Sequence, residues 1–213
     1  GKKGGILAFN VRDTITLNAD LDVTGKGFRG GNTYVFGDAV LSCFTDDYFL
    51  DSMSTTSSRK GEGITNLLPG KLNGRGPLAN GGGGGNGHNS GGGGGGNGTT
   101  GGFGGYQLFQ CSSSFHDNRG IGGTTLTYSN ATNKIFLGGG GGAGHKDGFP
   151  SPPVPLSSAG GDGGGIIIVS SGYLKSNGHT IIADGAHGKQ CDLDGFTCLH
   201  DGMGGGGAGG TIL

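Results

Sequence analysis

The sequence predicts an all-β protein: a solenoid-like or sandwich-like scaffold that carries packed polyglycine II helices in a glycine-rich insertion. Three observations lead to this prediction. Glycine accounts for 57 of 213 residues, about four times its average usage. The apolar residues are clustered in short segments that are rich in β-branched side chains and bounded by glycine, such as GGILAF and GGGIIIVSS. Glycines interrupt every apolar pattern that would have the period of an amphipathic helix.

Two stretches near the ends of the chain are similar and predict a recurring strand, turn and second strand. GGILAFNVRDTITLNADLDVTGKG near the start is echoed by GGGIIIVSSGYLKSNGHTIIADGAHG near the end. Ile6 precedes Gly25 by the same distance as Ile166 precedes Gly185. Leu21 and Val23 match Ile181 and Ala183 in the same register, so the unit is expected twice.

The chain is expected to form one compact module in three parts. Residues 1–60 are an N-terminal β segment, 61–165 a glycine-rich layer and 166–213 a C-terminal β segment. Because the sequence begins without Met and stops within a strand-like word, a fragment of a longer or processed protein is expected. In the segment KIFLGGGGGAGH, 134–145, five consecutive glycines follow an apolar stretch. The structure of such glycine runs is the main question for the middle part.

An ordered glycine run is costly, because glycine loses more backbone entropy on folding than any other residue. Packed polyglycine II helices offer a reason for it, since their backbones approach more closely than a Cβ permits and can satisfy one another's hydrogen bonds. Asn86 and Asn97 would then end glycine runs, and the rings of His88 and His145 would bond to neighbouring backbones. The alternative is a disordered linker of glycine and asparagine.

Four cysteines, Cys43, Cys111, Cys191 and Cys198, are an even number without tight metal-ligand spacing. In an exported protein they are expected to form two disulfides. Cys191 and Cys198 flank a hairpin-sized loop, which favours their pairing and leaves Cys43 for Cys111. The alternative is four buried free thiols.

Several phrases together resemble a glycine-rich module of very large secreted surface proteins of Bacteroidota, which are adhesive or gliding-associated. They are LNADLDVTGKGFRGG, GGGGGNGHNSGGGGGG, KIFLGGGGGAGH and DGMGGGGAGGTIL, and the likeness runs along nearly the whole chain. The resemblance implies export, display at the cell surface and an extended, repetitive parent molecule. It implies no chemistry.

Composition and motifs argue against several functions. The net charge of -1 does not indicate electrostatic binding to nucleic acid or to an anionic membrane, which attract strongly basic proteins. No apolar run is long enough to span a bilayer. The G-x-S-x-G, H-E-x-x-H and P-loop patterns of common enzymes are missing. Four aspartates, Asp46, Asp47, Asp192 and Asp194, could serve as acid and base only if they converged. We therefore expect no enzyme.

Ligand candidates are few. Asp192 and Asp194, in the word DLDG, copy the opening of a calcium loop without its closing glutamate, so a structural Ca²⁺ ion is the one cofactor considered. Tyr106, Phe115 and Phe149 are candidates for contacts with glycans. The competing interpretation of the aromatics near Tyr106 is that they cover the glycine layers.

These observations predict a non-catalytic, extracellular structural or adhesive module. Its expected partners are neighbouring domains of the same chain, further copies of the module in a filament, or glycans. The alternative is a carbohydrate-binding or carbohydrate-active β-helix domain. Ice binding is less favoured, because the threonines form only short local clusters.

Overall fold

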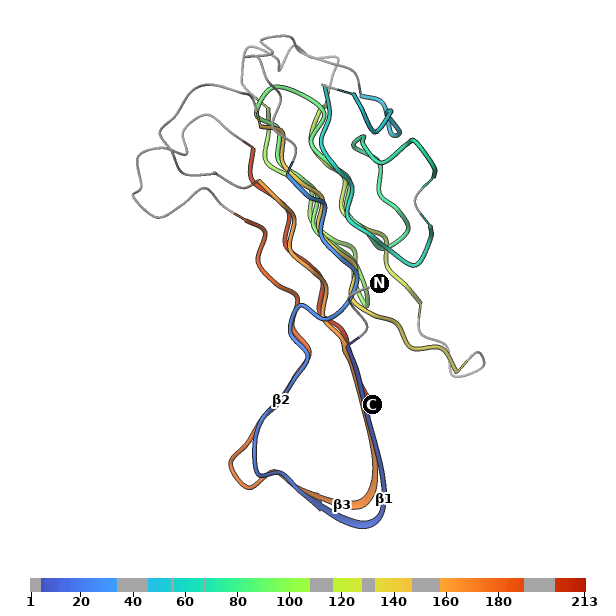
Figure 1. The fold of residues 1–213 in the computed structure, drawn as a ribbon, viewed down its shortest axis with the longest axis vertical. Helices are drawn as coiled ribbons and strands as arrows, with labels where there is room; N and C mark the ends of the chain where they lie inside the picture. The colour runs from blue at the N-terminus through green and yellow to red at the C-terminus, as the bar shows by residue number, and fades with distance from the viewer. Residues whose placement is uncertain are drawn as a thin grey trace.

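The computed structural model describes residues 5–33, 46–54, 56–66, 68–107, 117–127, 133–146, 158–189 and 202–213. This part of the chain has five strands and no helix. The all-β prediction therefore holds only in its coarse form, because most of the described chain is extended without belonging to a sheet. The described strands form no closed barrel and no complete solenoid. Figure 1 shows strands in the lower part of the molecule and long extended segments in the upper part.

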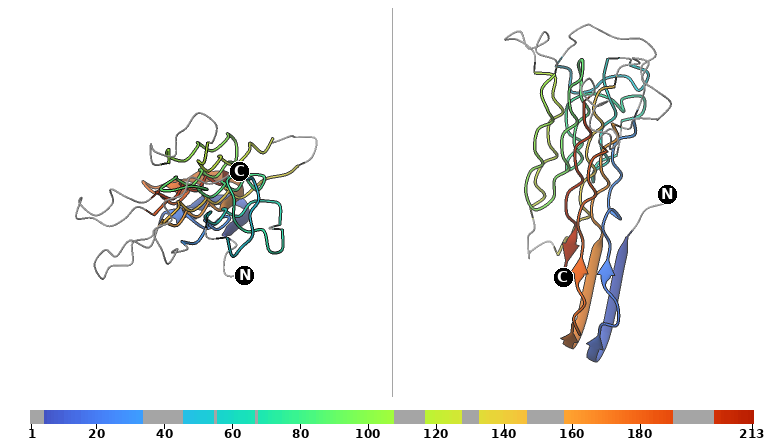
Figure 2. Two further views of the ribbon diagram at one scale, coloured as in Figure 1. Left: turned by 90° about the horizontal axis from the view of Figure 1, so that it is seen from above. Right: turned by 90° about the vertical axis from the view of Figure 1, so that its left-hand side faces the viewer.

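The strands form two small parallel sheets. Their bounds are β1 (Ile6–Thr16), β2 (Leu21–Asp22), β3 (Ile166–Lys175), β4 (Ile181–Ile182) and β5 (Thr211–Ile212). One sheet has the order β1-β3-β5 and the other pairs β2 with β4. β1 and β3 curve side by side, and each turns back through its following short strand (Figures 1 and 2).

The recurring strand, turn and strand that the sequence predicts is confirmed. Ile6 pairs with Ile166 in the first sheet and Leu21 with Ile181 in the second. A register shift between Val11 and Thr14 interrupts the first pairing. The similarity between the two stretches thus reflects two units stacked in parallel, a pairing that the sequence did not specify.

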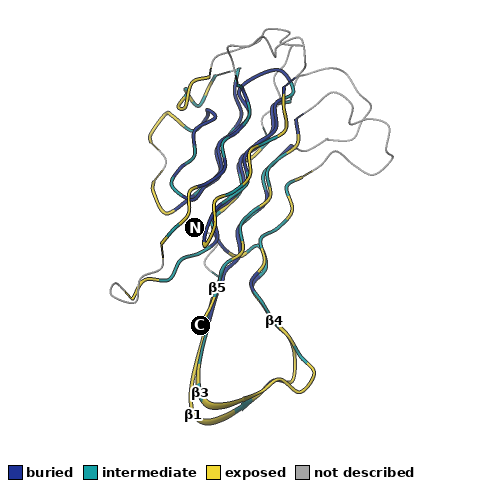
Figure 3. Cartoon of the chain, turned by 180° about the vertical axis from the view of Figure 1, so that it is seen from behind, coloured by how far each residue is buried: buried dark blue, intermediate teal, exposed yellow. Residues whose placement is uncertain are grey.

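The apolar core lies where the strands meet the extended segments. Val23, Ile167 and Ala183 are buried there, and Leu7, Leu21, Val169 and Ile181 pack against them. Most other buried residues belong to the glycine-rich part, whereas the curved strands are largely exposed or half-buried (Figure 3). Burial in this protein is therefore mainly burial of backbone.

The pentaglycine run lies at the centre of the glycine-rich part. We call residues 138–145 the central segment. Backbone hydrogen bonds join it to six other extended segments, three that accept its amides and three that donate to its carbonyls. These neighbours are 158–165, 90–97, 57–63, 25–33, 80–86 and 202–210. The segments run side by side along the long axis of the molecule (Figure 2).

The partners of the central segment change with a three-residue period. Gly138 donates to Gly164 at 2.9 Å, and three residues later Gly141 donates to Gly161 at 2.9 Å. The amides of Gly139, Gly142 and His145 donate to segment 90–97. Those of Gly140 and Ala143 donate to segment 57–63. Successive amides therefore point in three directions around the axis of the segment.

This packing leaves no room for side chains at the contacts. A Cβ built on Gly141 would overlap the carbonyl of Gly205, and one built on Gly160 would overlap the carbonyl of Gly141. The hydrogen-bonded segments also include 25–33 and 202–210, which lie outside the 61–165 insertion. The layer is thus assembled from distant parts of the chain.

Buried polar side chains bond to backbone groups within the layer. Asn80 is fully buried, donates to the carbonyls of Gly96 and Leu137 at 3.2 Å each, and accepts from the amide of Ile64 at 2.8 Å. The Ser58 hydroxyl donates to Gly144 at 2.8 Å. These side chains supply the partners that buried backbone groups need at the ends and edges of the glycine runs.

Candidate functional site

The candidate site is a surface group of two aromatic rings and two charged residues, which we call the aromatic cluster: Phe103, Tyr106, Asp117 and Arg119. Phe103 and Tyr106 follow the longest glycine run, and Gly104 between them donates its amide to Gly120 at 2.9 Å. The two aromatic residues are 58% and 71% exposed. Both rings are therefore largely in contact with solvent, and their role as a cover over the glycine layers stays a prediction.

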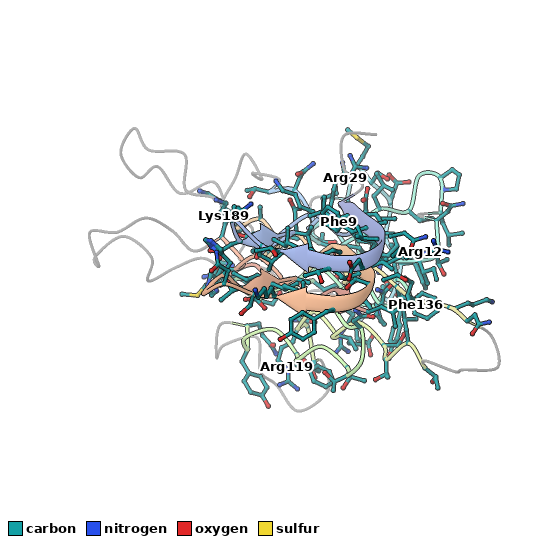
Figure 4. All side chains as sticks on the ribbon, turned by 90° about the horizontal axis from the view of Figure 1, so that it is seen from below. Phe9, Arg12, Arg29, Arg119, Phe136 and Lys189 are labelled. Atoms are coloured by element: carbon teal, nitrogen blue, oxygen red, sulfur yellow. The ribbon has the colours of Figure 1, made fainter. Side chains whose placement is uncertain are left out.

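Arg119 joins the two rings. Its guanidinium carbon lies 4.0 Å from the ring centroid of Tyr106 and 4.8 Å from that of Phe103. Both distances are within the range of a cation–π interaction. Seen from below, Arg119 lies on the opposite side of the molecule from Arg29, with the strands between them in projection (Figure 4).

Asp117 fixes the orientation of Arg119. The Nε and Nη2 atoms of Arg119 donate to the two carboxylate oxygens at 2.9 and 2.8 Å. Arg75 lies 3.2 Å from the same carboxylate and donates through its Nε to the Arg119 carbonyl at 3.0 Å. The hydrogen bond from Arg119 is the main cause that lowers the pKa of Asp117 and raises the pKa of Arg119 itself.

The aromatic cluster can present flat apolar surface beside a held cation. Tyrosine and arginine are enriched at the energetically dominant positions of binding surfaces, and aromatic rings supply a large contact area. The arrangement provides no nucleophile paired with a base, so it suits binding rather than covalent chemistry. Tyr106 was a predicted ligand-binding residue, whereas Arg119 and Asp117 were missed by sequence reasoning.

A second polar site surrounds Lys60, which is only 3% exposed. Its ammonium donates to the carbonyls of Tyr48, Gly74 and Gly76, and lies 4.4 Å from the ring centroid of Phe49. Burial lowers the pKa of Lys60 to about 7. Because its three acceptors are backbone carbonyls from two stretches of chain, we interpret Lys60 as a structural brace.

A polar cavity of about 580 Å³ adjoins Lys60 and is lined by charges of both signs, including Arg29, Glu62 and Asp162. These charges serve neighbouring segments. Arg29 pairs with Glu62, and Asp162 accepts from the amide of Gly30 at 2.9 Å. The cavity thus lies among side chains that link segments 25–33, 57–63 and 158–165.

The predicted structural residues lie at the ends of glycine runs. Asn86 is fully buried, donates to the Asp47 carbonyl at 2.7 Å and accepts from the Ser57 hydroxyl at 2.5 Å. Asn97 donates to the carbonyls of Gly209 and Gly210 at 2.9 and 3.2 Å.

His88 and His145 are also buried, and the backbone amide of His145 donates to Ser90 at 2.9 Å. The bonds expected from their rings to glycine backbones stay a prediction.

The other predicted site residues lie outside the described residues. They are the four cysteines with their proposed disulfides, the calcium candidates and two of the three aromatic candidates: Cys43, Cys111, Cys191, Cys198, Asp192, Asp194, Phe115 and Phe149. Within the described ranges, no three His, Cys, Asp or Glu side chains gather as metal ligands. The calcium site and the disulfides stay predictions.

The residues that sequence reasoning missed share a weak signal. Lys60, Asp117 and Arg119 are charged residues within three positions of a glycine, and the fully buried Asn73 and Asn118 are also near glycines. A charged residue close to a glycine run is the pattern that could have drawn attention to them. It does not identify their partners, because these come from distant segments.

Across the parts of the chain that the structure describes, no helix is long and apolar enough to cross a membrane. Comparisons of the chain with family models, curated proteins and solved structures find no match.

Proposed function

We propose that this chain is a non-catalytic structural module whose rigid body is a bundle of polyglycine II helices and whose edges present adhesive side chains. The observation that carries the proposal is the three-residue period of the backbone hydrogen bonds around the central segment. An extended helix with three residues per turn turns successive amides by about 120°, so each helix can bond to neighbours on all sides. Such a bundle needs glycine at its contacts, as Gly141 and Gly160 illustrate.

The bundle suits a scaffold better than a catalyst. Its interior is filled by backbone groups that bond to one another, which leaves few side chains to move or react. The stacked strand units at one end are consistent with the proposed solenoid-like element, because a solenoid buries its core by repeating such units in parallel. We place the module outside the cell, at the surface of a bacterium, on the strength of its resemblance to surface proteins.

The adhesive part of the proposal rests on the aromatic cluster. Two exposed rings held around one guanidinium form a surface that can stack on the apolar faces of sugar rings. We propose glycans as its ligands. The test is binding of the full chain to a glycan array, followed by titration of the best glycan against Tyr106→Ala. We expect at least a tenfold loss of affinity with an unchanged circular dichroism spectrum.

Tyr173→Ala is the matched control, because Tyr173 is 61% exposed and belongs to β3 rather than to the aromatic cluster. It is expected to bind glycans like the parent protein. Equal losses in both variants, or no glycan binding at all, would remove the adhesive part and leave a purely structural module.

One observation favours a second candidate, a carbohydrate-active β-helix domain. The parallel pairing of β1 with β3 is the arrangement of neighbouring coils in such a helix. Incubating the chain with the glycans that it binds, and analysing them for shortened products, tests this candidate. We expect the glycans to remain intact.

A further inference from the structure

An open position lies beside segment 90–97 in the glycine bundle. This segment is joined by backbone hydrogen bonds to five extended neighbours among the described residues, one fewer than the central segment. The five are 80–86, 101–105, 117–123, 138–145 and 202–210.

The hydrogen-bond pattern directs the carbonyls of Gly92, a buried residue, and Gly95, which is half-buried, towards the open position. Among the described backbone amides, none donates to these two carbonyls. The carbonyls between them are used, since Gly93 accepts from Gly142 and Gly94 from Gly123, each at 2.8 Å. Because partners repeat every three residues, Gly92 and Gly95 belong to one unfilled row.

The two segments that flank the open position contribute amides. Gly102 and Gly206 accept from segment 90–97 at 2.9 Å each, and their own amides donate to no described backbone carbonyl. In the central segment, the amide and the carbonyl of one residue bind two adjoining neighbours: Gly139 donates to segment 90–97 and accepts from segment 202–210. By the same rule, the amides of Gly102 and Gly206 face the position next to segment 90–97.

We call this open position, with segments 101–105 and 202–210 on its two sides, the groove. Gly102, Gly105, Gly206 and Gly209 are all exposed. A pocket of about 510 Å³ borders the groove at Gly95 and Gly209. No charged residue is among its lining residues, which include Gly95, Asn97, Thr99, Ala208, Gly209 and Ile212. An uncharged occupant with both donors and acceptors therefore fits the groove.

The glycines of the groove are not required by the fold. A Cβ on Gly102 or Gly105 would meet nothing within 4 Å, and one on Gly206 or Gly209 would lie 3.8 or 3.7 Å from the nearest atom. Their neighbours differ, because a Cβ on Gly101, Gly104, Gly205 or Gly207 would overlap backbone. Ordering a glycine costs more conformational entropy than ordering other residues. Glycine at these open positions therefore indicates that a further backbone, absent from the described chain, packs closely against them.

We propose that this groove binds an extended, glycine-rich segment of another polypeptide chain, which completes the sixth position around segment 90–97. The occupant would donate to Gly92 and Gly95 and accept from Gly102 and Gly206, much as an added strand completes the edge of a sheet. At Gly139, whose amide donates to Gly96, a Cβ would overlap the Asn80 carbonyl and also fall 2.9 Å from the Gly96 oxygen. A side chain at Gly206 would press on the occupant in the same way.

The groove sets the length and composition of its ligand. A three-residue helix rises about 3.1 Å per residue, so five residues such as 101–105 span roughly 15 Å. A run of five or six glycines matches that length. The proposal rests on the polyglycine packing of the proposed function and not on its adhesive part.

The experiment is a titration of the full chain with a hexaglycine peptide that carries one lysine at each end, followed by amide chemical shifts. We expect saturable changes centred on Gly92, Gly95, Gly102 and Gly206. The matched ligand is a hexaalanine peptide with the same terminal lysines, which has the same charge and length but carries Cβ atoms. It is expected to bind at least tenfold more weakly. Absent binding, or equal binding of the two peptides, would overturn the proposal.

Gly206→Val and Gly102→Val test the groove from its two walls. Each is expected to weaken binding of the hexaglycine peptide at least tenfold while the spectrum of the central segment is unchanged. Tyr173→Ala, on β3 and outside the groove, is the control and is expected to bind the peptide normally. Two valine variants that fold and still bind would refute the groove.

Amide exchange of the unliganded chain separates the two proposals. A slowly exchanging central segment without peptide binding removes the groove and leaves the scaffold. A rapidly exchanging central segment removes both.

Discussion

At the scale of the residue, the protein depends on the absence of side chains. Gly141 and Gly102 illustrate two kinds of glycine: a Cβ on the first would overlap backbone, whereas a Cβ on the second would face open space. Gly102 is the second of two adjacent glycines, and a Cβ on the first, Gly101, would overlap backbone. Only the surroundings of each residue decide whether a methyl group can be added.

The first prediction compares these two positions. Gly141→Ala must displace the neighbouring backbone at Gly205, so we expect it to lower the free energy of unfolding by about 1–3 kcal/mol or more, the usual range for overpacking. Gly102→Ala is expected to be neutral or slightly stabilising, because alanine restricts the unfolded chain. Urea denaturation of both variants measures the difference, and equal stabilities would contradict the packing.

The second prediction concerns the pH dependence that Lys60 contributes. Its pKa is about 7 in the folded protein against an ordinary value of 10.5. Between these values the unfolded chain holds a proton that the folded chain lacks, so unfolding takes up a proton and stability rises with pH. We expect the free energy of unfolding to rise from pH 7 towards pH 10, and this rise to be smaller in Lys60→Met.

Urea denaturation at several pH values provides that comparison. Parallel pH curves for the parent and Lys60→Met would show that Lys60 remains protonated in the fold. Its three carbonyl acceptors would then offset the effect of burial.

At the scale of the element, the two strand units depend on each other for their core. Ile167 in β3 is fully buried, whereas its neighbour in register, Leu7 in β1, is only partly buried. Ile6, one residue earlier in β1, is 56% exposed. The side chains of Ile167 and Ile6, near the starts of β3 and β1, therefore contribute differently to the apolar core.

The third prediction follows from this difference. Ile167→Ala is expected to cost about 2–5 kcal/mol, the usual range for removing a buried isoleucine side chain. Ile6→Ala is expected to cost much less, because its side chain already contacts water. Chemical denaturation checks both values, and a larger loss from Ile6→Ala would contradict the core assignment.

At the scale of the whole molecule, stability is expected to decrease from the centre of the bundle to its edges. The central segment bonds to six neighbours, whereas segment 101–105 lies at an edge. The fourth prediction is that amides of residues 139–142 exchange with solvent most slowly, and that those of Gly102 and Gly105 exchange within the dead time. Exchange of the centre requires opening of the bundle as a whole, whereas exchange at the edge does not.

Hydrogen exchange followed by NMR measures this gradient. Uniform rapid exchange would identify the glycine-rich part as the flexible linker that composition alone allows. Uniform slow exchange would show that the edges are covered in solution, for example by another chain in the groove beside segment 90–97.

The sequence by itself determined the recurrence of the strand units and the local purpose of glycine. The match of Ile6 with Ile166 and of Leu21 with Ile181 was visible because apolar residues report the pattern of a strand and its turns. Close backbone approach was an available explanation of the pentaglycine run, because glycine alone lacks a Cβ. The buried cation of Lys60 and the cluster around Arg119 were not predictable, since both depend on residues that are distant in the sequence.

Only the tertiary structure decided which segments are neighbours. Glycine runs carry no side chains that distinguish one from another, so the sequence cannot state that 138–145 is central or that 101–105 lies at an edge. Among the described residues, their placement is seen in the backbone hydrogen bonds and in the direction in which successive amides point. The identity of a neighbour in this protein is set by backbone hydrogen bonds, and every glycine offers the same ones.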